Sequence, residues 1–375
     1  MAIRRPANHP TPQPPLTTSH RDVVGFWLLL LCAGACTGAD GPVTCTPTAS
    51  TSCGTDPNPA PWPGSNDVTT ADNAGVLGKN ISGLVFDPSV PGVLWAVRNS
   101  PGELFRLNSG AGIWTPDAAG GWLNGRALRY PDGRGDPDAE GVTITTAGVS
   151  GGVYVSAERN NLVGSVSRLS VLRYDLSQPG TVLRATHEWN LTSMIPSTDP
   201  NLGLEGITWV PDSMLTANGM VDEHTAQAYR PADYPSHGSG LFFVGVESTG
   251  ALYAFALNHS ANSAVRVSSS TSGLAEVMEL EFDDLTGQMW AICDNGCGNR
   301  SVVLEIAQTA PDKGRFRVVR QFLRPSSLPD VNNEGFAIAP RSACSGGRRA
   351  VLWSDDDNSA GYALRRASLP CAPVR

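Results

Sequence analysis

Short runs of alternating apolar and polar residues, separated by turns rich in Gly, Pro, Asn and Asp, fill most of the chain after residue 70. Such alternation is typical of half-buried β-strands. One phrase recurs in five of these runs: a Glu or Ser, usually a Gly, then apolar residues. Its first polar residues are spaced by 58, 65, 74 and 55 residues, and they are Ser82, Glu140, Glu205, Glu279 and Glu334. A fixed phrase at such spacings predicts a repeated supersecondary unit.

Each phrase is followed by a turn and further predicted strands. The second strands are the more apolar ones: Val93–Val97, Val153–Ala157, Leu241–Val246, Met289–Cys293 and Ala350–Ser354. The third strands alternate: Glu103–Leu107, Val171–Asp175, Ala251–Leu257, Val302–Ile306 and Gly361–Arg365. Candidate fourth strands are Val182–Trp189, Ala264–Ser268 and Phe316–Phe322.

Four-stranded antiparallel units repeated in this way predict an all-β fold of the β-propeller type. Five blades is the direct count, and a sixth, divergent blade would fit within the two longest intervals. The last repeat has room for about three strands before the chain ends, so a strand near Gly75–Lys79 is expected to complete that blade and close the ring.

The composition and net charge exclude some folds and partners. Only 17% of the 375 residues are charged, while Gly and Pro number 40 and 29, which disfavours long amphipathic helices. The net charge of −8 makes a nucleic-acid backbone an unsuitable partner and favours sites that hold a hard cation.

The N-terminal segment has the features of an export signal. Arg4, Arg5 and Arg21 precede the apolar run 23–31, which is too short to span a bilayer and is followed by small residues. The residues before Cys36 resemble a bacterial lipobox, so this cysteine is a candidate for acylation, with ordinary cleavage to a secreted protein as the alternative.

We therefore expect a signal peptide over residues 1–35, a Pro/Thr/Ser-rich tether over 36–70 and a propeller over 71–375. The protein is expected outside the cytoplasm, as an outer-membrane or cell-surface lipoprotein or in secreted form. It would contact the membrane only through the lipid, and we expect a monomer.

Six cysteines remain after Cys36, an even number that favours disulfides in an oxidising compartment. Proximity in the sequence favours the pairs Cys45–Cys53, Cys293–Cys297 and Cys344–Cys371. The alternative for the second pair is half of a zinc site, but no second Cys or His pair stands at a suitable spacing.

Two sets of acidic residues are expected at one mouth of the propeller, because each phrase opens an innermost strand. The first set is Glu140, Glu205, Glu279 and Glu334. The second follows the second strands: Asn99, Glu158, Glu247, Asp294 and either Asp355 or Asp356. Converging carboxylates raise one another's pKa unless a cation neutralises them, and their oxygens would suit Ca²⁺. The alternative is that each Glu only ties neighbouring blades together.

The segments Asp138-Ala-Glu-Gly-Val142, Val153-Tyr-Val-Ser-Ala-Glu158 and Asn201-Leu-Gly-Leu-Glu-Gly-Ile207 resemble the phytase-like propeller family labelled "esterase-like activity of phytase". The Ser82-Gly83 and Glu-Gly phrases are also similar to the SdiA-regulated propellers. The resemblance spans about Gly75 to Cys371 and implies a bacterial, exported propeller with bound calcium. Ser82 replaces the Glu of the other blades and blade four lacks the Gly, so the site departs from symmetry.

Two functions remain open, and the sequence leaves undecided whether the protein is an enzyme. The first is a surface binding or scaffold module that takes a small-molecule, carbohydrate or protein ligand at the mouth. Trp114, Trp122 and Tyr234 are candidate exposed loop aromatics for it. The second is a calcium-dependent phosphoesterase or esterase, with a ring carboxylate or His237 as base. Ser150 lies in a G-x-S-x-G pattern, but within a predicted hairpin turn, where Gly and Ser are ordinary.

Overall fold

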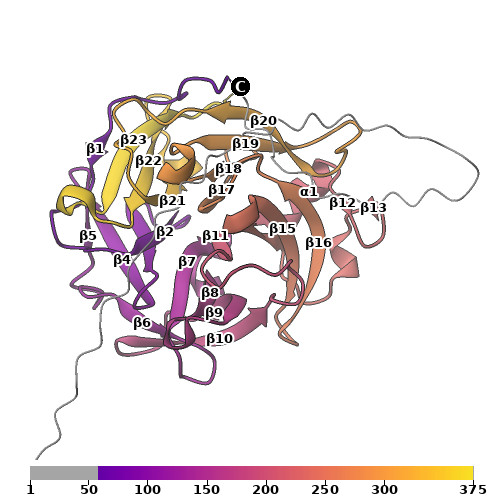
Figure 1. Ribbon diagram of the computed structural model, residues 1–375, viewed down its shortest axis with the longest axis horizontal. Coiled ribbons are helices and arrows are strands. Elements are labelled where there is room, and N and C mark those ends of the chain that lie inside the picture. Colours follow the sequence, from indigo (N-terminus) through magenta and orange to yellow (C-terminus); the bar gives the residue numbers. More distant parts are fainter. Residues whose placement is uncertain (1–57, 375) are drawn as a thin grey trace, which may run out of the picture. The chain divides into compact units, whose positions relative to one another are not determined.

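A computed structural model describes residues 58–374, and these residues form a five-bladed β-propeller (Figure 1). Blades 1 and 2 comprise the strands β2 (Ile81–Phe86), β3 (Val93–Arg98), β4 (Glu103–Gly110), β5 (Ile113–Pro116), β6 (Arg126–Arg129), β7 (Pro137–Ile144), β8 (Val153–Asn160), β9 (Ser167–Tyr174) and β10 (Val182–Asn190). Blades 3 and 4 comprise β11 (Leu204–Pro211), β14 (Gly240–Val246), β15 (Ala251–Asn258), β16 (Ser263–Thr271), β17 (Glu279–Asp283), β18 (Gln288–Ile292), β19 (Ser301–Ile306) and β20 (Phe316–Phe322). Blade 5 comprises β21 (Asn333–Ile338), β22 (Arg348–Asp355), β23 (Leu364–Pro370) and β1 (Thr69–Thr70).

Within each blade, strands adjacent in sequence pair antiparallel, and the first strand is the innermost. The inner strands β2, β7, β11, β17 and β21 surround a central axis, as Figure 1 shows. Blade 1 has a divided outer edge, because β5 and β6 both pair with β4. Strand β6 also pairs in parallel with β10, which joins the edges of blades 1 and 2. The expected all-β propeller of five four-stranded blades is confirmed in this form.

Ring closure uses a different segment from the one expected. Strand β1 pairs with β23, Thr69 opposite Arg366, so the indigo start of the domain lies beside its yellow end in Figure 1. Residues 75–79, which we expected to form this strand, lie in a turn, where Gly75 and Gly78 adopt positive φ angles. The third strand of blade 5 also begins later than expected, at Leu364, because Ser359–Gly361 form a short 3₁₀ turn.

Residues before position 71, where we expected the propeller to begin, already pack against it. Ala60 pairs with Phe322 of β20, and Trp62 is 5% exposed between Trp290 and Trp353. A buried tryptophan contributes a large apolar area, which holds this segment against blades 4 and 5. The expected signal peptide, Cys36 and the Cys45–Cys53 pair lie outside the described residues.

Five apolar clusters among the described residues correspond to the five contacts between neighbouring blades. Trp290 of blade 4 packs with Phe336 of blade 5, for example, and Phe242 of blade 3 packs with Tyr154 of blade 2. Each sheet is therefore apolar on both faces, which explains the near-continuous apolar second strands. None of the described helices is long and apolar enough to cross a membrane.

Blade 3 carries the insertion between its first two strands, with α1 (Asp212–Ala217), β12 (Val221–Asp222) and β13 (Gln227–Ala228). Its polar residues bond to one another: Tyr229 donates to Asp212 Oδ1 at 2.8 Å, and His237 Nε2 lies 3.1 Å from Asp212 Oδ2. His237 is 5% exposed. This network holds the insertion together at the end of the domain where the inner strands finish.

Candidate functional site

The residues of the recurring phrase lie where the inner strands begin, which we call the near end of the axis. In four blades the pairing register shifts at the phrase, giving a β-bulge. The exception is blade 4, which has Leu280 in place of the Gly and a regular register. A Cβ on Gly206 would lie 2.4 Å from the Leu280 nitrogen, so the Gly allows adjacent inner strands to approach closely.

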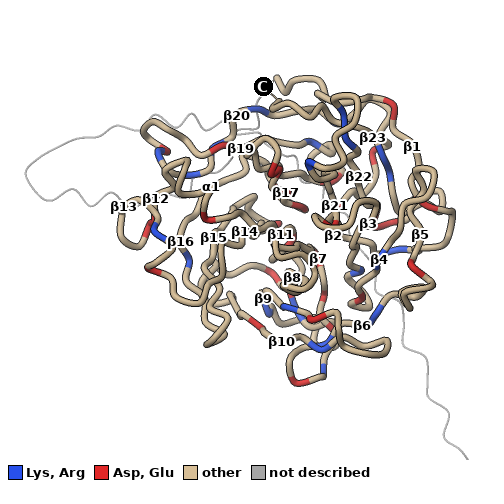
Figure 2. Tube along the Cα trace, turned by 180° about the vertical axis from the view of Figure 1, so that it is seen from behind, with Lys and Arg blue, Asp and Glu red and all other residues tan. Residues whose placement is uncertain are grey.

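Five acidic side chains from blades 2 and 3 gather at the near end, and we call them the acid cluster. They are Asp138, Glu140, Glu158, Glu205 and Glu247. They form two groups that share Glu158: one with Asp138 and Glu140, the other with Glu205 and Glu247. Within each group one carboxylate oxygen per residue lies within 4.8 Å of the others. Figure 2 shows acidic segments of the inner strands around the centre of the ring.

The two groups differ in how their charge is balanced. Arg159 Nε lies 2.6 Å from Asp138 Oδ2 and neutralises part of the first group. The second group has no ion pair with a basic side chain of the described residues. Its one backbone donor is Gly203 N–H, 2.8 Å from Glu158 Oε1. Glu205 Oε2 is buried and accepts no hydrogen bond from the described residues. An uncompensated buried carboxylate is costly, so this group has the stronger need for a cation.

Burial and mutual repulsion raise the pKa values of these carboxyl groups. Burial raises the pKa of Glu158 to about 7. It raises that of Glu247 to about 8, with the charges of Glu158 and Glu276 adding to the effect. The pKa values of Glu140 and Glu205 lie well above the usual range, first through burial and then through neighbouring acids. Perturbed carboxyl groups in a cavity mark a candidate functional site.

A cavity of about 210 Å³ opens beside the acid cluster. Besides acids, its lining is rich in amide groups: Asn80, Asn99, Asn161 and Asn201. Asn99 Nδ2 donates to Glu140 Oε2 over 3.4 Å, so the amides and carboxylates form one polar wall. Such a wall suits a ligand that carries several hydroxyl or carbonyl groups.

Glu334 lines the same cavity from blade 5. Asn332 Nδ2 donates to its Oε1 at 2.9 Å, while its Oε2 is buried without a donor. Its pKa is raised well above the usual range by burial and by the nearby charge of Asp356. It therefore borders the site without belonging to either group of three acids.

Glu279 is placed differently from the other three glutamates expected at the mouth. Its carboxylate accepts hydrogen bonds from the backbone N–H groups of Leu84, Ile207 and Leu280, at 3.2, 3.3 and 3.0 Å. It thus connects blade 4 to blades 1 and 3 across the axis. Because blade 4 lacks the bulge, this side chain points into the ring and does not join the acid cluster.

The second expected set is also divided by the structure. Glu158 and Glu247 belong to the acid cluster, and Asn99 borders it. Asp294 lies beside Glu276, whose pKa is raised to about 7 by burial and then by Asp294. Glu276 comes from a loop outside the repeated phrase, and sequence patterns gave no reason to single it out. Asp355 is fully buried, accepts a hydrogen bond from Ser359 N–H and forms an ion pair with Arg365. The charge of Asp356, in contrast, raises the pKa of Glu334.

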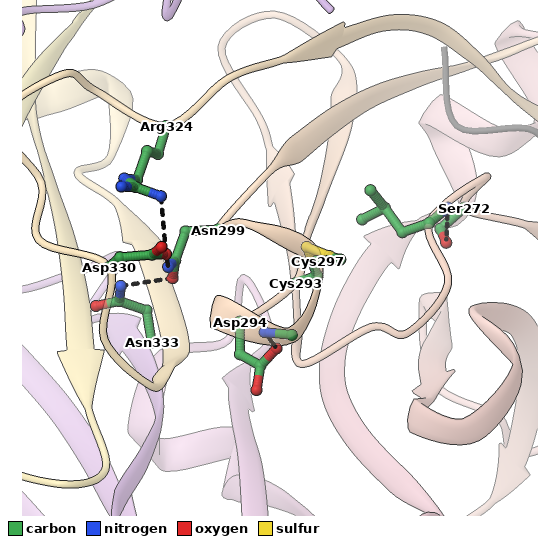
Figure 3. The surroundings of a disulfide bond; sticks show 10 residues. Ser272, Cys293, Asp294, Cys297, Asn299, Arg324, Asp330 and Asn333 are labelled. Atoms are coloured by element: carbon green, nitrogen blue, oxygen red, sulfur yellow. Dashed lines mark hydrogen bonds and ion pairs between the residues drawn. A yellow bond between two sulfur atoms is a disulfide. The ribbon is translucent and has the colours of Figure 1, made fainter. Parts of the chain in front are cut away.

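Two of the three expected disulfides are present in the described part of the chain, Cys293–Cys297 and Cys344–Cys371. Figure 3 shows the first beside Asp294, whose carboxylate accepts from Gly296 N–H at 2.7 Å. The neighbouring network of Asn299, Asp330 and Arg324 fixes the same loop region. Disulfides are typical of proteins in oxidising, extracytoplasmic compartments.

The aromatic residues suggested as exposed ligand contacts are buried, which corrects that expectation. Trp114, Trp122 and Tyr234 are 5%, 5% and 8% exposed. They pack in the cores of the blades and of the insertion. Ser150 lies in a 3₁₀ turn between β7 and β8 and donates to the Ala147 carbonyl, a turn-forming role.

Comparison with solved structures gives distant matches. The chain is similar to the glutaminyl cyclase of Myxococcus xanthus, with 13% identity over 80% of this chain and 95% of that one, and a TM-score of 0.41. It is also similar to a Thermus thermophilus protein described as an oxidoreductase (glucose dehydrogenase), with 13% identity over 81% and 99% of the two chains and a TM-score of 0.40. For the hydrazine synthase of Kuenenia stuttgartiensis the identity is 16%, the coverage 74% and 56%, and the TM-score 0.35.

No protein-family model and no curated protein sequence matches the chain. The class of protein is thus defined by the fold itself, a five-bladed propeller with a buried acid cluster that could hold a metal ion. Membership of the phytase-like or SdiA-regulated families stays a prediction.

Proposed function

We propose that this protein is an exported, lipid-anchored propeller that binds calcium at the near end of its axis and uses the adjacent cavity to hold a ligand at the cell surface. The observation that carries the proposal is the group of Glu158, Glu205 and Glu247, which is buried or partly buried and has no ion pair with a basic side chain in residues 58–374. A divalent cation would neutralise carboxylates that otherwise repel one another.

The donor set favours Ca²⁺ over other metals. All candidate ligand atoms are carboxylate oxygens, which suit hard cations and lack the thiolate or imidazole groups that zinc and copper prefer. Three carboxylates offer up to six oxygens, and Ca²⁺ takes roughly six to eight in flexible geometry. The amides around the cavity would supply further oxygens to the ion or to its ligand.

The cavity supports a binding role for a polar ligand, such as a carbohydrate or a peptide. Its lining contains four asparagines and no aromatic residue, so recognition would rest on hydrogen bonds and on the cation rather than on ring stacking. Arg159, the one basic residue of the lining, is already bonded to Asp138, which disfavours a highly anionic ligand.

Export and anchoring rest on the N-terminal sequence together with the two disulfides. An apolar run with a basic flank and the small residues before Cys36 support a lipoprotein signal. Mass spectrometry of the protein from bacterial membranes tests this directly, since acylated Cys36 would be the first residue. Serine at position 36 should release the protein from the membrane.

A calcium-dependent ester or phosphoester hydrolase is the second candidate. Glu158 and Glu247 favour it, because carboxyl groups with pKa values of about 7 and 8 are suited to move protons near neutral pH. The metal would contribute charge stabilisation to the reacting oxygen. The absence of a free basic side chain in the cavity lining makes this candidate weaker for phosphoesters.

Thermal unfolding with EDTA and then with added Ca²⁺ tests the proposal. The wild-type protein should gain stability with Ca²⁺, and the Glu140→Gln/Glu205→Gln double variant should lose that gain. Glu305→Gln, exposed in strand β19, is the control and should respond like the wild type. An unchanged wild-type melting temperature would leave the glutamates as ties between blades. Ester and phosphoester assays with and without Ca²⁺ then separate the two candidate functions.

A further inference from the structure

A second cavity, of about 120 Å³, lies at the far end of the axis, where the inner strands finish. All five blades contribute to it, and it shares no lining residue with the cavity at the near end. About half of its lining is apolar, and the aromatic residues Phe86, Trp209 and Phe282 belong to this half. Thr146 and Asp284 are exposed, so the cavity opens to solvent beside them.

Acidic side chains outnumber basic ones around this cavity. Glu281, Asp283 and Asp284 line it, and Arg349 is the one basic lining residue. The Arg349 guanidinium is already committed, with Nη2 in a buried ion pair with Asp283 and Nη1 donating to the Ala339 carbonyl at 3.2 Å. Glu281 therefore has no ion pair with a basic side chain of the described residues, although the charge of Arg349 lowers its pKa in part.

Glu281 has one carboxylate oxygen available for a ligand. Its Oε1 accepts a hydrogen bond from Ile338 N–H at 3.2 Å, and no described residue donates to Oε2. Burial raises the pKa of this carboxyl well above the usual range, with Asp283 and Asp284 adding to the effect. A cation beside it would relieve this cost.

A second polar group in the cavity wall also lacks a partner. Arg349 is 4% exposed, and its Nε–H is buried with no acceptor among the described residues. A buried donor without an acceptor is costly, so an oxygen atom on a ligand would be favoured there.

We propose that the far-end cavity binds a small organic cation of the amino-alcohol class, with its ammonium group between Glu281 and the aromatic walls and its hydroxyl oxygen toward Arg349. Aromatic faces attract alkylammonium groups as well as apolar ones, whereas a metal ion would need several oxygen ligands. The volume suits a molecule close to benzene in size, which fills an apolar cavity of roughly 150 Å³. This site is independent of the calcium site proposed at the near end.

Choline and its uncharged isostere 3,3-dimethylbutan-1-ol provide a direct test, because they differ in charge and hardly in shape. Calorimetric titration of the full chain in EDTA should show choline binding at least about tenfold more tightly than the alcohol. Glu281→Gln should abolish that preference, since the amide keeps the acceptor for Ile338 N–H but removes the charge. Glu205→Gln, at the near end, should leave it unchanged.

Phe282→Leu provides a second variant in case Glu281→Gln folds poorly. It should weaken choline binding by about threefold or more, with little effect on the alcohol, because only the cation interacts with the ring face. Failure of choline to bind a folded wild-type protein would overturn the proposal, as would equal affinities for the two compounds. Competition between Ca²⁺ and choline would instead assign the cavity to a metal ion.

Discussion

At the near end of the axis Glu158, Glu205 and Glu247 lie together with no ion pair to a basic side chain of the described residues, whereas at the far end Asp283 is paired with the buried Arg349. Both ends are acidic and both are built from the same repeated strands. Each end neutralises one aspartate internally, Asp138 with Arg159 at the near end and Asp283 with Arg349 at the far end. The difference is that the near end leaves a group of three carboxylates for an external cation, whereas the far end leaves one, Glu281. Similar blades thus produce two sites that differ in how much negative charge remains for a cation.

The largest expected effect comes from breaking the internal pair at the far end. Arg349→Met would leave Asp283 buried without its partner and should lower the free energy of unfolding by about 3–5 kcal/mol. Urea titration measures this. Arg320→Met, exposed in the outer strand β20, is the control and should change little. If the Asp283→Asn/Arg349→Met double variant is no more stable than Arg349→Met alone, the unpaired charge is not the cause.

The next effect concerns stability and tests how closely the inner strands approach one another between the two ends of the axis. Gly206→Ala places a methyl group 2.4 Å from the Leu280 nitrogen and 2.5 Å from the Glu279 Cα, and should cost about 3 kcal/mol. Gly164→Ala is the matched control, since Gly164 has ordinary φ and nothing within 4 Å. Equal stability of the two variants in urea would show that the strands can separate without cost.

The two disulfides should differ by a smaller amount in how much each stabilises the folded protein. Cys293–Cys297 closes a separation of 4 residues at the near end, and Cys344–Cys371 closes one of 27 residues after the far end of β21. Loop-closure entropy predicts losses of about 2 and about 3.5 kcal/mol when each pair is replaced by alanines. The first replacement should also weaken Ca²⁺ binding, because its loop carries Asp294, whose charge acts on Glu247 of the acid cluster. An unchanged calcium affinity would exclude the loop from the site.

The last effect concerns pH. In EDTA the folded-state pKa values of Glu158 and Glu247, about 7 and about 8, lie above the ordinary value of 4.5, so the folded protein binds more protons than the unfolded chain between these limits. Stability should therefore fall as pH rises from about 5 to about 8. Calorimetry should find a melting temperature several degrees lower at pH 8. Ca²⁺ should remove the dependence, and a rise with pH in EDTA would contradict the assignment.

Sequence patterns located most strands and the polar residues that begin each inner strand, because alternation and repetition are local properties. They also located Glu140, Glu158, Glu205 and Glu247 at one mouth. Sequence patterns did not distinguish Glu279 from the glutamates of the other blades, although the sequence of blade 4 has Leu280 in place of the Gly. The consequence of that change, a regular register that directs Glu279 toward backbone amides, depends on how five strands pack around one axis.

The sequence by itself determined the repeated β-sheet architecture and the polar composition of the near end, and proximity in the chain favoured the two cysteine pairs that the structure contains. Only the tertiary structure decided that Arg159 neutralises one acidic group and leaves the other free, and that the ring closes through Thr69–Thr70. It also decided that Glu281 and Arg349 meet at the second cavity. The physical reason is that strand formation follows from neighbouring residues, whereas charge pairing and burial depend on contacts between blades that are distant in the chain.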